Sequence, residues 1–138
     1  MIKSIQIFSH DEAEKFKPPK NYSIISISSP GKKTKLKKGY SGKLKLTFHD
    51  IDGDCPGLTK FRLLHAVMIL RFLRRINKRN RHLVINCGTG ASRSVAVALF
   101  VSKKYSLRIN TEKDLSNYNK LVYEKLVETD KFLGAKND

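Results

Sequence analysis

The sequence predicts a single α/β domain with a central, mostly parallel sheet of four or five strands and helices on both faces. Short β-branched runs alternate with segments of helical periodicity, which is typical of parallel sheets. The chain has 138 residues, the length of one domain, and its 40% hydrophobic and 29% charged content is typical of globular proteins. We therefore expect residues 1–138 to form one domain that needs no metal or disulfide to fold.

The first third of the chain predicts three strands and one short helix. The strands are expected at residues 3–8, 22–28 and 43–48, where short β-branched or alternating runs are bounded by turn residues. Residues 9–12 (Ser-His-Asp-Glu) form a capping box, which predicts a helix that stops before Pro18.

A long amphipathic helix is expected next, with Thr59 as its N-cap. Its expected apolar stripe consists of Phe61, Leu64, Met68 and either Phe72 or Ile76. The other side of this helix is crowded with arginines.

The remainder of the chain predicts one central strand and two helical regions. Residues 82–86 (HLVIN) are apolar enough for a strand buried on both faces, and residues 92–105 predict a buried helix. Thr111 and Asp114 are expected to start a further helix, whose periodicity continues to Gly134.

Positive charge is concentrated in the first three quarters of the chain, and the formal net charge is +16. Residues 1–45 and residues 46–105 each hold 11 Lys or Arg against 3 Asp or Glu, whereas residues 106–138 hold 6 of each. Such a field attracts anions, so phosphorylated proteins, nucleic acids and acidic lipids are all candidate partners.

Other sequence features limit the class of protein. No apolar run approaches the ~18 residues that a membrane span requires. The first eight residues alternate polar and apolar side chains, unlike a signal peptide, and there are only two cysteines. We expect a cytoplasmic, monomeric protein with no membrane span, no metal and no cofactor.

The segment between the central strand and the buried helix carries the chemistry. It reads Cys87-Gly-Thr-Gly-Ala-Ser-Arg93-Ser94. Gly88 and Gly90 let the backbone N–H groups converge on one point, at which the following helix aims its positive end. Arg93 adds a planar fork for two phosphoryl oxygens, and the same field is expected to lower the pKa of Cys87 and make it a nucleophile.

This segment resembles the signature loop of the cysteine-dependent protein tyrosine phosphatases, in their compact dual-specificity branch. The order of elements also agrees over residues 20–130, from the strand that precedes His49 and Asp50 to a late helix opened by residues 117–119. The resemblance implies that the phosphate is bound by Gly88, Thr89, Gly90, Ala91, Ser92 and Arg93.

The resemblance also implies catalytic roles. Cys87 would attack phosphorus to form a phosphocysteine, Arg93 would hold the equatorial oxygens, and Ser94 would hydrogen-bond the sulfur as it leaves. The family takes its general acid from an Asp on the loop before the long helix. Alignment on the preceding strand favours Asp50, with Asp52 and then Asp54 as alternatives.

One residue departs from the family pattern. The family places His directly before the nucleophile, whereas this chain has Asn86. The Asn amide can still donate and accept hydrogen bonds but carries no charge. This difference bears on the rate more than on the type of reaction.

We expect a metal-independent phosphatase acting on phosphotyrosine in proteins, with phosphoserine and phosphothreonine as further substrates. Two alternatives stay open. The same chemistry could act on RNA 5′-phosphates or phosphoinositides, or the loop could serve a non-catalytic phosphate-binding module.

Overall fold

The structure is a computed structural model that describes residues 1–137, with side chains through residue 134. Its elements occur in the following order: β1 (Ser4–Phe8), α1 (His10–Lys15), β2 (Tyr22–Ser28), β3 (Gly42–Thr47), α2 (Leu63–Asn77), β4 (His82–Asn86), α3 (Arg93–Tyr105) and α4 (Lys120–Asn137). All four predicted strands are confirmed to within one residue at each end.

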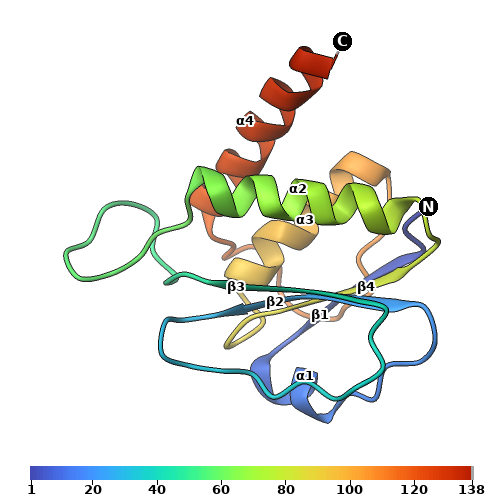
Figure 1. Cartoon of the computed structure of the whole chain (residues 1–138). Coiled ribbons are helices and arrows are strands. Elements are labelled where there is room, and N and C mark those ends of the chain that lie inside the picture. The colour runs from blue at the N-terminus through green and yellow to red at the C-terminus, as the bar shows by residue number, and fades with distance from the viewer. Residues whose placement is uncertain (138) are drawn as a thin grey trace.

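The strands form one four-stranded sheet in the order β1-β4-β2-β3, and every neighbouring pair is parallel. Helices α2 and α3 cover one face, α4 packs against these two helices and extends away from the sheet, and the short helix α1 lies on the other face (Figure 1). This arrangement confirms the predicted α/β class with helices on both faces.

The core lies around the two central strands. Ile85 of β4 and Ile25 of β2 on one face, and Val84 and Ile24 on the other, are fully buried, because both faces of these strands are covered. The carboxyl ends of β1, β4 and β2 meet at one edge of the sheet, where Phe8 pairs with Asn86 and Asn86 with Ser26. Cys87 follows at this edge, which is where open parallel sheets bind their ligands.

The N-terminal capping box is present as predicted. The Ser9 side chain accepts a hydrogen bond from the Glu12 N–H, and the Glu12 carboxylate accepts one from the Ser9 N–H. Helix α1 then ends before Pro18.

The start of the long helix was predicted wrongly. Helix α2 begins at Leu63 rather than after Thr59. Thr59 is instead held by two hydrogen bonds to His49. The Thr59 N–H donates to the ring nitrogen Nδ1 of His49, and the backbone N–H of His49 donates to the Thr59 carbonyl. Phe61 precedes the helix and is fully buried against Phe48.

The predicted apolar stripe of this helix is also partly wrong, because Phe61 lies outside the helix and does not set its phase. Leu64 and Met68 are exposed to solvent. The buried side of α2 is formed by Ala66, Ile69, Leu70, Phe72, Leu73 and Ile76.

No helix starts at Thr111 or Asp114. These side chains bond to nearby backbone groups instead, with the Lys113 N–H donating to Thr111 Oγ1 and the Ser116 N–H donating to Asp114 Oδ1. Such local bonds favour turns over helix. Helix α4 begins only at Lys120, and Asn119 Oδ1 accepts from the N–H of Val122 in its first turn.

None of the helices within residues 1–137 is both long enough and apolar enough to cross a membrane.

Candidate active site

The Cys87 thiol is enclosed by the loop of residues 87–92 that connects β4 to α3 (the phosphate loop). The residue is 1% exposed, and its Sγ atom lies 3.1 Å from the Ser94 hydroxyl oxygen. Burial on its own raises the pKa of this thiol. The Ser94 hydroxyl and the N–H groups of Ser94, Gly90 and Ser92 outweigh burial, so the pKa lies below the ordinary value of 9.0.

The loop backbone is held so that its N–H groups face inward. Carbonyl groups on its outer side accept bonds from neighbouring segments. The His10 N–H at the start of α1 donates to the Gly88 carbonyl, and the Asn119 N–H donates to the Ser92 carbonyl. With these carbonyls turned outward, the amides of residues 90, 92 and 94 surround the sulfur and form a concave anion site.

Gly90 is required by the close approach of the loop to the end of β1. Its φ is +70°, and a Cβ atom there would lie 2.8 Å from the Ser9 nitrogen and 2.9 Å from the Phe8 carbonyl carbon. The predicted need for glycine therefore holds at this position. Gly88 has no positive φ, and a Cβ there would lie 3.4 Å from Nη2 of Arg93.

The Arg93 guanidinium is buried and anchored at one nitrogen. Its Nη1 donates to the Phe48 carbonyl at 2.8 Å and to the Ser29 hydroxyl at 3.1 Å. Its Nε–H is buried and has no hydrogen-bond partner in the described chain. A buried donor without a partner is costly, so this atom is suited to bind an anion that enters the site.

The Asp50 carboxylate lies at the rim of the loop. Its Oδ1 accepts a hydrogen bond of 2.9 Å from the Ser92 hydroxyl and another of 2.9 Å from the side-chain amide of Asn119. Asn119 also donates to the Ile51 carbonyl, so it connects the segment that holds Asp50 to the start of α4.

The two alternative acids lie farther along the same exposed loop. Asp54 forms an ion pair of 2.7 Å with Lys60, which lowers its pKa through that hydrogen bond and charge. Asp52 lines the same hollow as Ser92 but has no hydrogen bond or ion pair among the described residues. Of the three carboxylates, the structure brings Asp50 to the loop.

Asn86, which occupies the position of the family histidine, is completely buried. Neither its Nδ2 nor its Oδ1 has a hydrogen-bond partner among the described residues. Its side chain therefore does not brace the loop through hydrogen bonds in this structure.

Two hollows flank the phosphate loop. One, of about 490 Å³, is lined by Gly88, Thr89 and Arg93, by residues 27–29 at the end of β2, by Lys32, and by residues 10–11 of α1. The other, of about 730 Å³, is lined by residues 50–55, Ser92 and residues 116–120. Thr89 and Ala91 are exposed on the loop between them.

A group of three potential metal ligands lies beside the smaller of these hollows. His10, Asp11 and Glu14 place one ligand atom each within 4.8 Å of one another. The two nitrogens of the His10 ring already have polar neighbours, Thr34 Oγ1 at 3.1 Å and Glu14 Oε2 at 3.3 Å. This grouping was not predicted, although His10 and Glu14 are spaced for contact on one helix turn.

Two residues that shape the site were missed by sequence reasoning. Ser29 supports the Arg93 guanidinium, and its only signal was a polar residue directly after a predicted strand. Asn119 supports Asp50, and its signal was an Asn before helical periodicity, which indicates a cap rather than this second role.

Comparison with protein-family models finds none that matches, and a search of curated proteins finds no significant match. Solved structures do match. Human DUSP28 is 14% identical with a TM-score of 0.66, over 96% of this chain and 94% of the other. The human tyrosine phosphatase-like serine/threonine/tyrosine-interacting protein is 15% identical with a TM-score of 0.64, over 92% of this chain and 91% of the other. The chain therefore has the fold of the compact dual-specificity phosphatases.

Proposed function

We propose that the chain is a metal-independent phosphatase that hydrolyses phosphotyrosine in proteins, and that its site also accepts phosphoserine and phosphothreonine. The observation that carries this proposal is the buried Cys87 thiol, with a lowered pKa, inside a ring of backbone N–H groups. The phosphatase-like fold supports it.

The first half of the reaction is a transfer of the phosphoryl group to sulfur. The Cys87 thiolate attacks phosphorus in line, the S–P bond forms and the bond from phosphorus to the ester oxygen breaks. The loop amides and the guanidinium of Arg93 stabilise the three equatorial oxygens in the transition state. Asp50, in its protonated form, gives a proton to the leaving oxygen.

The second half is hydrolysis of the phosphocysteine. The Asp50 carboxylate takes a proton from a water molecule, whose oxygen attacks phosphorus as the S–P bond breaks. The Ser94 hydroxyl, 3.1 Å from Sγ, donates a hydrogen bond to the departing thiolate. Inorganic phosphate is released, and the Cys87 thiolate and the protonated Asp50 are restored for the next turnover.

The test is release of phosphate from an aryl phosphate in the presence of EDTA. We expect turnover that Cys87→Ser abolishes, while vanadate or phosphate binding survives because the loop amides and Arg93 remain. Ser94→Ala serves as a matched hydroxyl control that keeps the thiol and should turn over more slowly.

Two outcomes of these measurements would contradict the proposal. Binding of phosphate without any turnover would indicate the non-catalytic phosphate-binding module. Turnover of RNA 5′-phosphates or phosphoinositides in preference to phosphotyrosine peptides would keep the mechanism and replace the substrate class.

A further inference from the structure

A recess lined by cations lies at the edge of the sheet opposite the candidate active site. It has a volume of about 270 Å³ and lies at the amino ends of β2 and β3, whereas Cys87 follows the carboxyl end of β4. Its lining includes Lys43, Arg75, Arg79 and Arg81. Because all strands are parallel and β4 has five residues, the two sites are about 15 Å or more apart.

The recess continues into a second hollow, of about 530 Å³, on the outer side of α2. Arg75 and Arg79 line both, and Arg71, Arg74 and Lys78 complete the outer one. No carboxylate lines either hollow, and none of these side chains has an ion-pair partner within the part of the chain that the structure describes. Cations gathered in this way repel one another, so a bound anion would relieve the repulsion.

The floor of the recess contains an unsatisfied hydroxyl. Ser23 is 0% exposed, and its Oγ atom has no hydrogen-bond partner among the described residues. A Cβ at Gly42 would lie 3.2 Å from the Ser23 oxygen and 3.5 Å from the Phe72 ring, so glycine at this position lets β3 pack closely beside the hydroxyl. An oxygen of a bound ligand would satisfy the hydroxyl, whose isolation is otherwise costly.

The chemistry of this lining favours a phosphate monoester. Arginine forks bind phosphate oxygens in pairs, and one guanidinium is already oriented, since Arg81 Nη1 donates to Asn21 Oδ1 and to the Arg79 carbonyl. A monoester has three terminal oxygens that can be contacted from the floor and the sides of a recess. A phosphodiester, which offers two, suits a flat surface better.

The neighbouring strand favours a protein as the carrier of this phosphate. Strand β3 is the last in the sheet order, so one of its edges has no strand beside it within the described residues. It runs from Gly42 in the recess toward the segment that holds Asp50. An extended peptide can hydrogen-bond along such an edge, which a lipid or a nucleic acid does not do.

We propose that this recess binds a phosphorylated side chain of a partner protein, as a second phosphate distinct from the one bound over Cys87. The identification of that partner as the substrate rests on the proposed function. The substrate class is then a protein with two phosphorylated residues, one for each site.

The test compares peptides that carry phosphotyrosine, phosphoserine or both, about five residues apart, since an extended chain covers ~3.3 Å per residue and the two sites are about 15 Å apart. Dissociation constants are measured on the full chain with Cys87→Ser, which prevents turnover. We expect the doubly phosphorylated peptide to bind at least about 10-fold more tightly than the phosphotyrosine peptide. Arg75→Ala/Arg79→Ala should remove that gain and leave the phosphotyrosine peptide unaffected.

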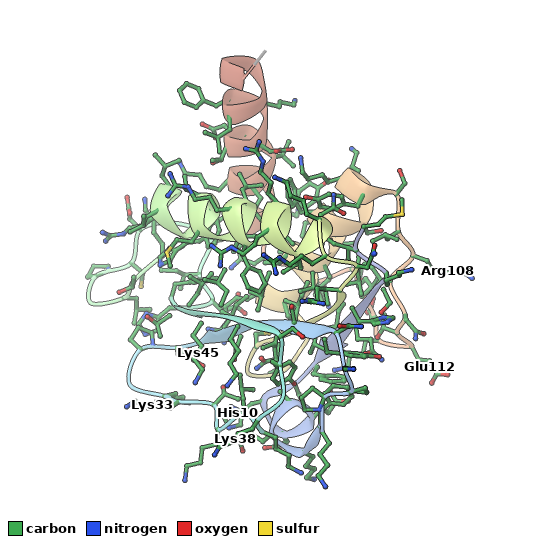
Figure 2. The ribbon with its side chains drawn as sticks, turned by 45° about the vertical axis from the view of Figure 1, so that its right-hand side comes forward. His10, Lys33, Lys38, Lys45, Arg108 and Glu112 are labelled. Atoms are coloured by element: carbon green, nitrogen blue, oxygen red, sulfur yellow. The ribbon has the colours of Figure 1, made fainter. Side chains whose placement is uncertain are left out.

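A matched control is Lys17→Ala/Arg108→Ala, which removes the same charge from exposed residues outside both hollows. Figure 2 shows Arg108 projecting from a side of the molecule away from Lys45 of β3. This control should keep the gain. An equal loss in both double variants would indicate general charge attraction and overturn the proposal.

Two further measurements separate this proposal from the proposed function. The phosphoserine peptide, with Phe in place of phosphotyrosine, is titrated into the Arg93→Ala chain, where the loop no longer holds phosphate. Binding that Arg75→Ala/Arg79→Ala abolishes would uphold the recess even if the aryl phosphate assay shows no turnover. Absence of this binding, or tighter arginine-dependent binding of oligouridylate or phosphatidylserine vesicles, would overturn it.

Discussion

The phosphate loop and the loop between β3 and α2 face each other across the candidate active site, and they are built very differently. In the phosphate loop and the first turn of α3, Cys87, Gly90, Arg93 and Ser94 are buried, and the outer carbonyls of the loop are bonded to α1 and to Asn119. The loop of residues 52–58 is largely exposed, projects away from the sheet and holds few tertiary bonds (Figure 1).

This difference agrees with the separate roles proposed for the two loops, which are to bind the phosphoryl group and to supply the general acid. The anion site must be preorganised, because its donors stabilise charge only if they are already in place. The segment that supplies the acid has to fit a leaving group, and it is anchored to the phosphate loop and to Asn119 through only two neighbouring residues, Asp50 and Ile51. Substitutions in the first region should therefore be severe, and those in the second should be graded.

After the complete loss of turnover in Cys87→Ser, the largest effect is expected from Arg93→Lys. The substitution keeps the charge but loses the fork that bonds Phe48 and Ser29 and leaves Nε for the phosphate. We expect kcat/KM for an aryl phosphate to fall by about 10²–10³-fold, the cost of removing one preorganised donor. Activity close to that of the unmodified chain would show that a point charge is sufficient.

Next in size is Asp50→Asn, which removes the proton donor but can keep the bonds from Ser92 and Asn119 to its amide oxygen. We expect a loss of about 100-fold in kcat, the lower end of general acid catalysis. The decline of kcat with rising pH, which reflects the loss of the proton from the general acid, should disappear. Asp52→Asn and Asp54→Asn are the matched controls, and a larger loss in either would move the acid to that residue.

A smaller effect is expected on the pKa of the Cys87 thiol. It is measured from the pH dependence of alkylation in a Cys55→Ser background. Because its pKa is lowered by the Ser94 hydroxyl and the loop amides against the opposing effect of burial, alkylation should remain fast below pH 9. Ser94→Ala should shift the midpoint to higher pH. An unchanged midpoint would mean that the loop amides alone lower the pKa of the Cys87 thiol.

The smallest effect is expected at His65, which supports the start of α2. Its pKa is lowered by burial and by the charge of Arg62, and its Nδ1 accepts from the Arg62 N–H at 2.8 Å. The folded state therefore favours the neutral ring. This stability is present above pH 6.5 and is lost as the pH falls through the lowered pKa. Between pH 7 and pH 5, the fall in Tm should be smaller for His65→Gln than for the unmodified chain. Equal falls in Tm would contradict this prediction.

The phosphate loop was predictable from sequence because its determinants are local. A cysteine after a buried strand, glycines and an arginine opening a helix all lie within eight residues. Gly90 and the lowered pKa of Cys87 agree with that prediction. The parallel sheet was predictable for a similar reason, since each strand is a short β-branched, alternating or apolar run.

The rest depended on contacts between distant segments. Thr59 was predicted as a helix cap, but His49 holds it in the preceding loop, and Phe61 is buried against Phe48. The choice among Asp50, Asp52 and Asp54 could not be made from spacing alone, because Asn119, 69 residues away, selects Asp50. No local pattern encodes that contact.

The central claim is that the sulfur of Cys87 accepts the phosphoryl group, and rapid quenching followed by mass spectrometry tests it most directly. With an excess of an aryl phosphate and EDTA, we expect one phosphoryl group on the peptide that carries Cys87, formed as fast as the aryl alcohol is released and absent in Cys87→Ser. Turnover that proceeds without this adduct, or an adduct on another residue, would contradict the account.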